Sequence, residues 1–417
     1  MPSSAIPLKQ LETYLVGDAV RDALLGIEAR ERDWVVVGAS SQDMLDKGFK
    51  QVGASFPVFL HPKNGEEYAL ARTDKNQGHG YHGFKVDFHP GVTLEEDLHR
   101  RDLTINAIAR DASGQLVDPF GGQKDIQQKV LRHVSGAFVE DPLRVLRVAR
   151  FAARFKSLGF RVHESTIELM KRITESGELQ YLAAERVWRE VEQAMREETP
   201  SEFVRVLRDC DALEALLPEV NALFGVPQPE KYHPEIDTGV HLLMALDMAA
   251  GLDKGNARMV FAVLLHDLGK GLTEQQYWPS HLGHEAAGLP LVDAVCERLK
   301  VPTASHDLAR KVCGHHLRCH RLLEAKPATV LRLLEKLDVF RQPQVLADFV
   351  MACEADFRGR KGLQDRHYPQ RAYLQRAYEA ASGILARDLD LGGISGPEVG
   401  QRLREARIEA IAKLPRG

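Results

Sequence analysis

Short apolar runs rich in β-branched residues alternate with turns over the first 135 positions of this 417-residue chain. They predict strands at 34–39, 48–53, 57–61, 67–72 and 85–89. From about residue 140, Leu, Arg, Ala and Glu recur at helical spacing, and the strand pattern nearly vanishes. The pattern therefore predicts an α+β protein, with a small α/β head followed by a long and mostly helical body.

The same pattern indicates how the chain divides. Three prolines within 224–234 mark a linker or sharp turn before a second helical module. A chain of this length has room for two to four domains of roughly 100–200 residues each. We expect an N-terminal extension, a head, a helical neck and body, an all-helical module and a helical tail, over 1–11, 12–135, 136–225, 238–340 and 341–417.

Composition narrows the class of protein. The 44% hydrophobic and 27% charged residues are typical of a globular protein, and no apolar run reaches the roughly 18 residues of a membrane span. The start of the chain does not have the pattern of a signal peptide. Five scattered cysteines suit a reducing compartment, so we expect a cytoplasmic protein without a membrane partner. The net charge of −4 means that any nucleic acid must be held by local basic surfaces.

The first candidate site lies between residues 15 and 37, in LVGDAVRDALLG and the strand that follows it. A glycine turn at Gly17 precedes Arg21, and Glu31 and Asp33 open the strand. Carboxylates two residues apart on a strand point to the same face, where a divalent metal would relieve their repulsion. A glycine turn with an arginine nearby suits a triphosphate beside that metal. The alternative is a solvated acid pair at a strand end.

A second group of candidates lies in RRDLTINAIA (100–109) and EDPLRVLRVARFAARF (140–155). Pro142 predicts the start of a helix with Asp141 as its N-cap. Because guanidinium groups are flat forks of donors, a stripe of arginines on this helix suits phosphate or base contacts. The alternative is a solvated helix face with a Glu140–Arg144 ion pair. At about 100° per residue, a stripe roughly 120° wide holds Arg144, Arg147, Arg150 and Arg154.

Taken in order, these motifs resemble those of the class II CCA-adding enzymes (tRNA nucleotidyltransferases) and the related bacterial poly(A) polymerases. The matching pieces are LVG-x-AVRDALLG, x-RDWVVVGA, EEYALAR, RRDLTINA, DPFGG and EDPLRVLRVARF. The resemblance implies a polymerase-β-like nucleotidyltransferase head that adds and repairs the 3′-terminal CCA of tRNA from CTP and ATP, without a nucleic-acid template. It also implies contact with the acceptor arm and 3′ end of tRNA, and a monomer or homodimer.

The resemblance assigns roles to individual residues. Glu31 and Asp33 take the places of the catalytic carboxylates that bind Mg²⁺. Asp141 and Arg144 take those of the amino-acid template, in which an acceptor and a donor match the edge of C or A. The full set implied for nucleotide binding is Gly17, the backbone at Asp18, Arg21, Arg101, Asp141, Arg144, Arg147 and Arg150.

Two of these positions depart from the family pattern. Asp18 stands where the family usually has the second glycine of a pair, and it adds a negative charge where a triphosphate approaches the backbone. Glu31 stands where the family usually has aspartate, and its extra methylene displaces a ligand of octahedral Mg²⁺. These departures keep one alternative open, a tRNA-binding hydrolase with an impaired transferase site. A second alternative is a poly(A) polymerase of the same superfamily, which would favour ATP alone.

The other strong motif is VFAVLLHDLGKG (260–271), in which an apolar helix delivers His266 and Asp267. Adjacent His and Asp side chains can reach one metal when neighbouring helices supply further ligands. The motif resembles the HD phosphohydrolases, and in the long CCA-adding proteins it implies 2′,3′-cyclic phosphodiesterase, 2′-nucleotidase and phosphatase activities. The alternative is a purely structural His-Asp pair.

The HD resemblance also implies a metal site. Its catalytic residues would be His266 and Asp267, and a metal-bound water would be the nucleophile. The expected metal is a divalent transition ion, with Ni²⁺ as a candidate. The expected ligands are His241, His266, Asp267, His284 and Asp356, with His315 or His316 as a further candidate. Basic segments at 150–161 and 358–376 could cradle the acceptor arm, or could be ordinary solvated helix faces.

Overall fold

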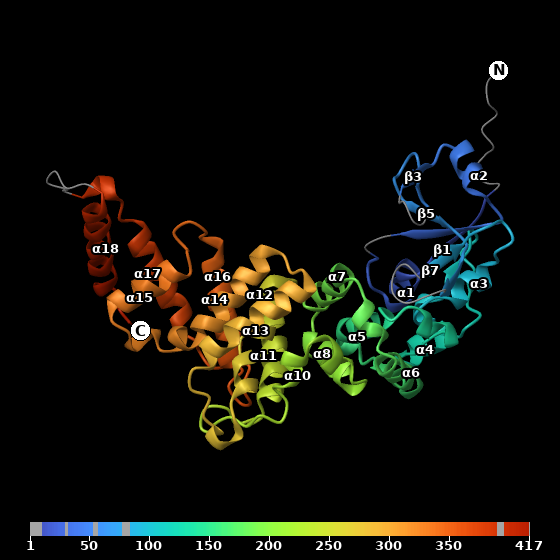
Figure 1. Cartoon of the computed structure of the whole chain (residues 1–417). Helices are drawn as coiled ribbons and strands as arrows, with labels where there is room; N and C mark the ends of the chain where they lie inside the picture. Colours follow the sequence, from blue (N-terminus) through green and yellow to red (C-terminus); the bar gives the residue numbers. More distant parts are fainter. Residues whose placement is uncertain (1–10, 30–31, 53–56, 77–83, 390–395, 417) are drawn as a thin grey trace. The chain divides into compact units, whose positions relative to one another are not determined.

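The computed structural model describes residues 11–29, 32–52, 57–76, 84–389 and 396–416 (Figure 1). The chain forms two compact units, Met1–Val187 with Val206–Leu216, and Trp188–Arg205 with Leu217–Gly417. Helices α7 (Ala184–Ala194) and α8 (Pro200–Asp209) contribute residues to both units. The five-part division expected from the sequence stays a prediction.

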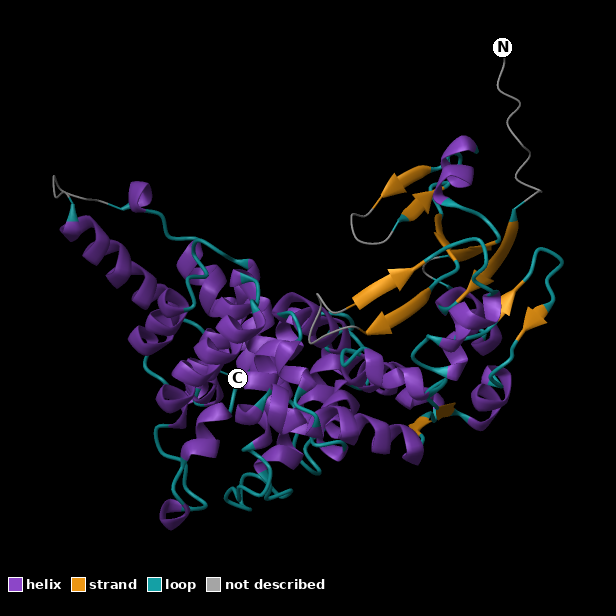
Figure 2. Cartoon of the chain, turned by 45° about the vertical axis from the view of Figure 1, so that its right-hand side comes forward, coloured by secondary structure: helices purple, strands orange, loops and turns teal. Residues whose placement is uncertain are grey.

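A seven-stranded mixed sheet organises the first unit (Figure 2). β1 pairs antiparallel with β2 and β8, β2 runs parallel to β5, and the other neighbours are antiparallel. In the order of the sheet, the strands are β3 (Lys50–Val52), β4 (Val58–Leu60), β5 (Glu67–Leu70), β2 (Asp33–Val37), β1 (Glu12–Val16), β8 (Ala109–Arg110) and β9 (Leu116–Val117).

All five strands predicted from the apolar runs are present. Four belong to this sheet, and the fifth, β7 (Phe84–Asp87), pairs with β6 (Thr73–Asn76). The expected loop at 78–84 lies almost wholly outside the described residues. Side chains alternate along β2, so Val35 and Val36 join two different apolar clusters. The sheet is therefore packed on both faces.

The helices of the first unit follow from local signals. α1 (Asp18–Leu25) starts directly after β1 because Gly17, at φ 67°, turns the chain through a conformation that favours glycine. α5 (Arg144–Phe155) buries one apolar side that includes Val145, Val148 and Phe151. The others are α2 (Ser41–Asp46), α3 (Leu94–His99), α4 (Gly122–Gln128), α6 (Glu164–Glu175) and α9 (Ala212–Leu216), with the short pair β10 (Val130–Leu131) and β11 (Arg161–Val162).

The described part of the second unit is helical. α12 (Ala257–Leu265) is buried along its length and packs against α11, α14 and α16. Its sequence is apolar on every side, which is the pattern of a helix in a core. The other helices are α10 (Pro218–Asn221), α11 (Thr238–Leu252), α13 (His284–Leu299), α14 (Thr303–His320), α15 (Pro327–Lys336), α16 (Gln344–Arg358), α17 (Gln370–Ser382) and α18 (Pro397–Ala412).

This architecture confirms the predicted fold class, a mixed head followed by helices. Among the described helices, none has both the length and the apolar character needed to cross a membrane.

Candidate functional sites in the two units

A polar hollow of about 370 Å³ lies in the first unit, where β1 and β2 meet the loop after α3 and the start of α5. Six arginines and four aspartates line it, so it combines the guanidinium donors of an anion site with carboxylates. The lining residues are Gly17, Asp18, Asp33, Arg72, Arg100, Arg101, Asp102, Asn106, Asp141, Leu143, Arg144, Arg147 and Arg186.

The pairing of β1 with β2 brings the glycine turn to the first carboxylate. Val16 lies opposite Asp33, so Gly17 and Asp18 follow β1 at the point where β2 begins. A Cβ on Gly17 would lie 3.2 Å from Nη1 of Arg101, so glycine allows the arginine to approach the turn. Glu31, the other predicted metal carboxylate, lies outside the described residues.

Asp18 is held by arginines. Its carboxylate accepts a hydrogen bond from Nη1 of Arg21 at 2.7 Å and lies 3.7 Å from Nη1 of Arg154. Burial opposes ionisation, but Arg21 and then Arg154 lower the pKa of Asp18 below its usual value. Since 47% of the side chain is exposed, a negative charge stands at the wall of the hollow at neutral pH.

Arg21 and Arg150 lie behind this wall and do not line the hollow. Arg21 is fully buried, donates to Asp22 and Asn106 at 2.6–2.9 Å, and lies over the ring of Phe151. Arg150 is 8% exposed and lies over the same ring, with 4.4 Å between its guanidinium carbon and the ring centroid. Arg21 thus joins α1 to α5 behind the site, and Arg150 packs on its own helix, α5.

Two buried carboxylates that the sequence interpretation missed hold the arginines of the hollow. Asp97, which is fully buried, accepts from Arg100 at 2.7 Å and from Arg101 at 3.1 Å. Asp102 accepts from Nε of Arg147 at 2.7 Å and from the Asn106 amide at 2.9 Å. Burial opposes ionisation of both, but these donors keep the pKa of each carboxyl below its usual range. The charges of Asp97 and Asp102 thus fix where the guanidinium groups lie.

The predicted N-cap at Asp141 is wrong. The regular helix begins at Arg144, with Leu143 in the N-cap position. The Asp141 carboxylate lies before this helix, where it accepts from the backbone N–H of Leu143 at 3.1 Å and from Arg186 at 3.1 Å. Arg144 is 5% exposed and donates to the backbone carbonyls of Ala137 and Arg100. This stripe of arginines is therefore not a solvated helix face, and Asp141, Arg144 and Arg147 all reach the hollow.

A second site lies among α11, α12, α14 and α16 of the second unit, where histidines and aspartates are buried together. Three groups of three described residues have ligand atoms within 4.8 Å of one another. The two that hold the predicted ligands are His241, His266 and Asp356, and Asp267, His284 and His316, while the third, His233, Glu235 and His241, shares His241 with the first. The structure thus brings together all five predicted ligands, and His316 joins them.

Asp267 stands between the two groups. Its Oδ2 lies 3.0 Å from Nε2 of His266, and its Oδ1 lies 3.3 Å from Nε2 of His284 and 3.6 Å from that of His316. Burial opposes ionisation, but His266 and Lys270 keep the pKa of Asp267 well below its usual value. An ionised carboxylate therefore offers one oxygen to each group.

The histidine tautomers fit a metal site. Nδ1 of His266, His284 and His316 faces a backbone carbonyl oxygen at 2.7, 2.8 and 3.1 Å, which requires a proton on Nδ1 of each neutral ring. Each Nε2 then carries a lone pair, and those of His284 and His316 face each other at 3.3 Å. Among the described residues, Nε2 of His266 and Oδ1 of Asp267 have no hydrogen-bond partner. Lone pairs that converge in this way are the arrangement that a divalent cation satisfies.

His315, the other histidine candidate, is not part of either group. Burial, followed by the charges of Arg318 and Lys336, lowers its pKa to about 4. His315 and His316 are adjacent on α14, so they point in directions about 100° apart. Helix phase thus decides which of the two meets the cluster.

The proline-rich segment predicted to be a linker supplies a carboxylate behind the metal ligands. Oε1 of Glu235 lies 3.1 Å from Nδ1 of His241 and 3.1 Å from Nδ1 of His233. The next residue, Ile236, has φ 63°, a conformation that is rare and strained for a β-branched side chain. Burial opposes ionisation, but the two histidines lower the pKa of Glu235. In the sequence, the only signal for this role was the closeness of His233 and Glu235 in HPEID, where Pro234 alone separates them.

We predict that Glu235→Gln weakens metal binding about 10–100-fold, because a carboxylate that orients a ligand histidine also raises its basicity. Isothermal titration of the metal-free protein with Ni²⁺ or Mn²⁺ measures this. Glu230→Gln, an exposed position in the same segment, serves as the matched control. An unchanged affinity in Glu235→Gln would show that Glu235 does not orient His241.

Comparison with known proteins shows the family of this chain. The chain matches three family models: the poly A polymerase head domain over residues 13–132, the probable RNA and SrmB-binding site of polymerase A over 159–224, and the HD domain over 238–341. It is 56% identical over 401 residues to a multifunctional CCA protein of Pseudomonas fluorescens, covering 96% of this chain and 98% of the relative. The resemblance found in the sequence motifs is thereby confirmed.

Solved structures agree with the fold. A CCA-adding enzyme in complex with CTP superposes with a TM-score of 0.62 at 21% identity, covering 98% of this chain and 88% of that one. The Thermotoga maritima CCA-adding enzyme complexed with tRNA superposes with a TM-score of 0.59 at 21% identity, covering 98% and 89% of the two chains.

Proposed function

We propose a two-part function for this chain, which belongs to the family of the multifunctional CCA proteins. The head adds the 3′-terminal CCA of tRNA from CTP and ATP. The HD unit hydrolyses phosphoric esters, including the 2′,3′-cyclic phosphates and 2′-phosphates found at RNA ends. The observation that carries the first part is the hollow in which Asp33 shares a wall with Gly17, Arg101 and Arg147.

In the head, Asp33 and Glu31 are the residues that would hold Mg²⁺. When bound, this ion supplies charge neutralisation for the triphosphate and activation of the primer 3′-hydroxyl. The chain itself positions the nucleotide: the Gly17 turn leaves room for phosphate, and Asp97 and Asp102 hold the guanidinium groups that bind it. Because little covalent chemistry is left to the protein in phosphoryl transfer, positioning accounts for most of its contribution.

Base selection would fall to Asp141 and Arg144. Asp141 is an acceptor whose carboxylate is held by a hydrogen bond from Arg186. Arg144 is a donor whose guanidinium group is held in place by hydrogen bonds to two backbone carbonyls. An acceptor and a donor side by side can match the Watson–Crick edge of C or A without a nucleic-acid template. Arg147 would contribute charge next to the phosphates, while Arg21 and Arg150 would support the site from behind.

In the HD unit, the two histidine–aspartate groups would hold divalent metal, with Asp267 between two positions. When bound, the metal supplies a water of lowered pKa as nucleophile. Asp356 would be an ionised metal ligand. Burial opposes its ionisation, but Arg360 and His320 keep the pKa of its carboxyl well below the usual value. Ni²⁺ is one candidate among transition ions that suit imidazole and carboxylate ligands.

Omission of single nucleotides separates CCA addition from the alternative, a poly(A) polymerase. With a tRNA that lacks CCA, the proposed function predicts two added residues with CTP alone, three with CTP and ATP, and then a stop. A poly(A) polymerase would extend the same tRNA with ATP alone and would not stop. Gel analysis of the product lengths therefore rejects one of the two functions.

We predict that Asp18→Gly lowers KM for CTP about three- to tenfold, because it removes an ionised carboxylate from the wall that a triphosphate approaches. Asp18→Asn, which removes the charge and keeps the side chain, should give most of this gain. Steady-state kinetics with tRNA lacking CCA measures both variants. An increase in KM on loss of the charge would mean that Asp18 instead helps to bind the nucleotide.

A further inference from the structure

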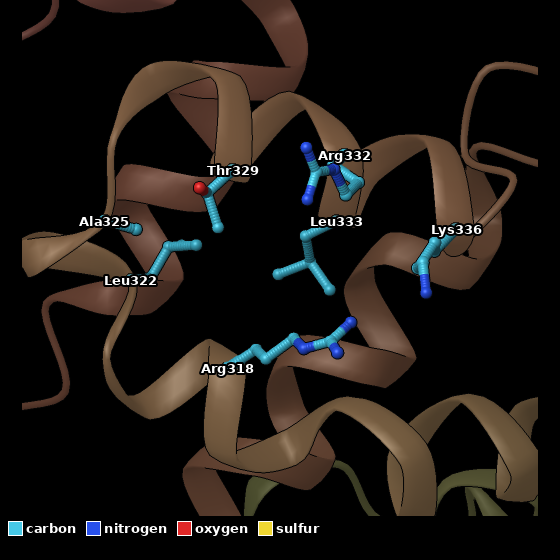
Figure 3. Close-up of a pocket in the computed structure, with 7 residues that line it drawn as sticks. All are labelled: Arg318, Leu322, Ala325, Thr329, Arg332, Leu333 and Lys336. Atoms are coloured by element: carbon cyan, nitrogen blue, oxygen red, sulfur yellow. The ribbon is translucent and has the colours of Figure 1, made fainter.

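A cationic hollow of about 210 Å³ lies in the second unit, between α14 and α15. Figure 3 shows the side chains of Arg318 from α14 and of Arg332 and Lys336 from α15 around Leu333. None of the described residues that line the hollow is acidic, and among described residues no carboxylate lies within ion-pair distance of these three cations. The remaining lining residues are Leu322, Ala325 and Thr329.

The arrangement of the cations around this hollow lowers the stability of the folded protein. Arg332 and Lys336 are four residues apart on α15, and like charges at this spacing destabilise a helix. The lining between these two cations and Arg318 is apolar, because it includes the side chains of Leu322 and Leu333, which are almost fully buried. An apolar floor strengthens the attraction between the surrounding cations and an anion.

Among the described residues, no neighbouring carboxylate pairs directly with the cations of the hollow, although the charge of Glu285 on α13 interacts with that of Arg318. Glu335, next to Lys336, is held by Arg404 of α18 at 2.8 and 3.1 Å. Arg416 donates to the backbone oxygen of Leu323 at 3.2 Å, which brings a fourth cation to the same corner of the fold. The local charge is therefore positive although the whole chain carries a net charge of −4.

The hollow is separate from the metal cluster. Arg318 and His316 are two residues apart on α14, so their side chains point in directions about 200° apart around the helix. His316 faces the metal ligands, and Arg318 faces the hollow. The phosphate that the HD unit hydrolyses cannot be the group that this hollow takes.

We propose that this hollow binds a single phosphate group, and that this phosphate belongs to the backbone of the tRNA substrate. The inference rests on the proposed function for the identity of the RNA. No aromatic side chain is among the described residues that line the hollow, so a base would lack the aromatic stacking partner that is typical of single-strand sites. Guanidinium and ammonium donors around one small space suit a phosphate, and proteins hold structured RNA mainly through phosphate and sugar contacts.

The test is the salt dependence of tRNA binding. The variants are Arg318→Gln with Arg332→Gln, and the triple variant that adds Lys336→Gln. Lys300→Gln is the matched control, since Lys300 is an exposed cation that ends α13 just before α14 begins. The first residue of α14, Thr303, is about 22 Å along the helix from Arg318, at about 1.5 Å per residue. Dissociation constants for tRNA lacking CCA are measured by filter binding from 50 to 200 mM KCl.

We expect the triple variant to bind tRNA roughly five- to tenfold more weakly at 50 mM KCl, and Lys300→Gln to bind like wild type. The slope of log affinity against log salt should fall by about 0.7–0.9, the value for one lost phosphate contact. An unchanged affinity and slope overturns the proposal. A slope that falls by about 2 or more also overturns it, because the three cations would then meet separate phosphates on an open surface.

Two further measurements distinguish binding of the RNA backbone from binding of a free nucleotide and from misfolding of the variants. Binding of ATP and CTP, measured with the same variants, should be unchanged; weaker nucleotide binding would assign the hollow to a free nucleotide and overturn its assignment to the RNA backbone. Metal content equal to that of wild type, and thermal unfolding at or above the wild-type temperature because the repulsion between Arg332 and Lys336 is removed, show that the variants fold. If wild type binds and extends no tRNA, the proposed function fails; if wild type does both and the variants match it, only this inference fails.

Discussion

Asp33→Asn is expected to lower the rate of nucleotide addition to tRNA at least about a thousandfold. The amide keeps the size of the side chain but removes the charge that holds a divalent cation at the start of β2, beside the Gly17 turn. The stabilisation that a metal gives to a phosphoryl-transfer transition state is several kcal/mol, and each 1.36 kcal/mol is a tenfold change in rate. Single-turnover extension of a tRNA lacking CCA, with saturating CTP and Mg²⁺, measures the loss.

The matched control is Asp46→Asn, an exposed aspartate on α2 outside the hollow, which should extend tRNA like wild type. Hydrolysis by the HD unit should be unchanged in both variants, because Asp33 belongs to the other unit. An Asp33→Asn protein that keeps more than a tenth of the wild-type rate would remove Asp33 from the catalytic site and require another carboxylate for the metal.

The second large effect is expected for Asp267→Asn in the HD unit. The Asp267 carboxylate places one oxygen near each group of ligands, and the change to an amide removes its negative charge. We therefore predict loss of metal from both positions. Hydrolysis of a 2′,3′-cyclic nucleotide should fall at least about a thousandfold, since both the lowered pKa of water and the template for the phosphate depend on the metal. Elemental analysis of metal per chain and phosphate release measure the two effects.

His315→Gln is the control for this change, because His315 lies next to a ligand on α14 but outside both groups. It should keep the metal content and the hydrolytic rate of wild type. CCA addition should persist in Asp267→Asn. Wild-type metal content in Asp267→Asn, together with normal hydrolysis, would mean that the cluster does not use Asp267 as a ligand.

The parts of the head site that could be predicted from the sequence are those set by local geometry. Gly17 and Asp33 are brought together by a register between neighbouring strands, and the arginine stripe follows helix periodicity. What the sequence could not provide is which arginines face the hollow. Arg21 is buried by the packing of α1 against Phe151 of α5, and packing between segments distant in sequence is not encoded in a local pattern. Arg150, which lies over the ring of its neighbour Phe151, is buried as well.

The same distinction applies to the HD unit. His266 and Asp267 stand out in the sequence because an apolar helix ends at them, and α12 is that helix. His316 and not His315 joins the cluster because of the rotation of α14 about its axis, and a shift of one residue changes the direction of a side chain by about 100°. The role of Glu235 could not be predicted from its proline-rich segment, because only the folded chain brings that segment next to His241.

Asp18 shows how a departure from a family pattern is accommodated. From the sequence, its charge is an obstacle to a triphosphate. In the structure, Arg21 and Arg154 lie at 2.7 and 3.7 Å and offset that charge. The effect of Asp18 on nucleotide binding is therefore expected to be moderate, which is consistent with a working transferase.

One measurement tests most directly whether this chain combines two chemistries. A tRNA that lacks CCA and ends in a 2′,3′-cyclic phosphate is incubated with the wild-type protein, divalent metal, CTP and ATP, and its 3′ end is sequenced. We predict that water opens the ring at the P–O3′ bond, that a second water releases the 2′-phosphate, and that CCA is then added to the free 3′-hydroxyl. If a tRNA with a 3′-hydroxyl gains CCA while the cyclic phosphate persists, the HD unit lacks the proposed activity; if neither tRNA is extended, the central claim is contradicted.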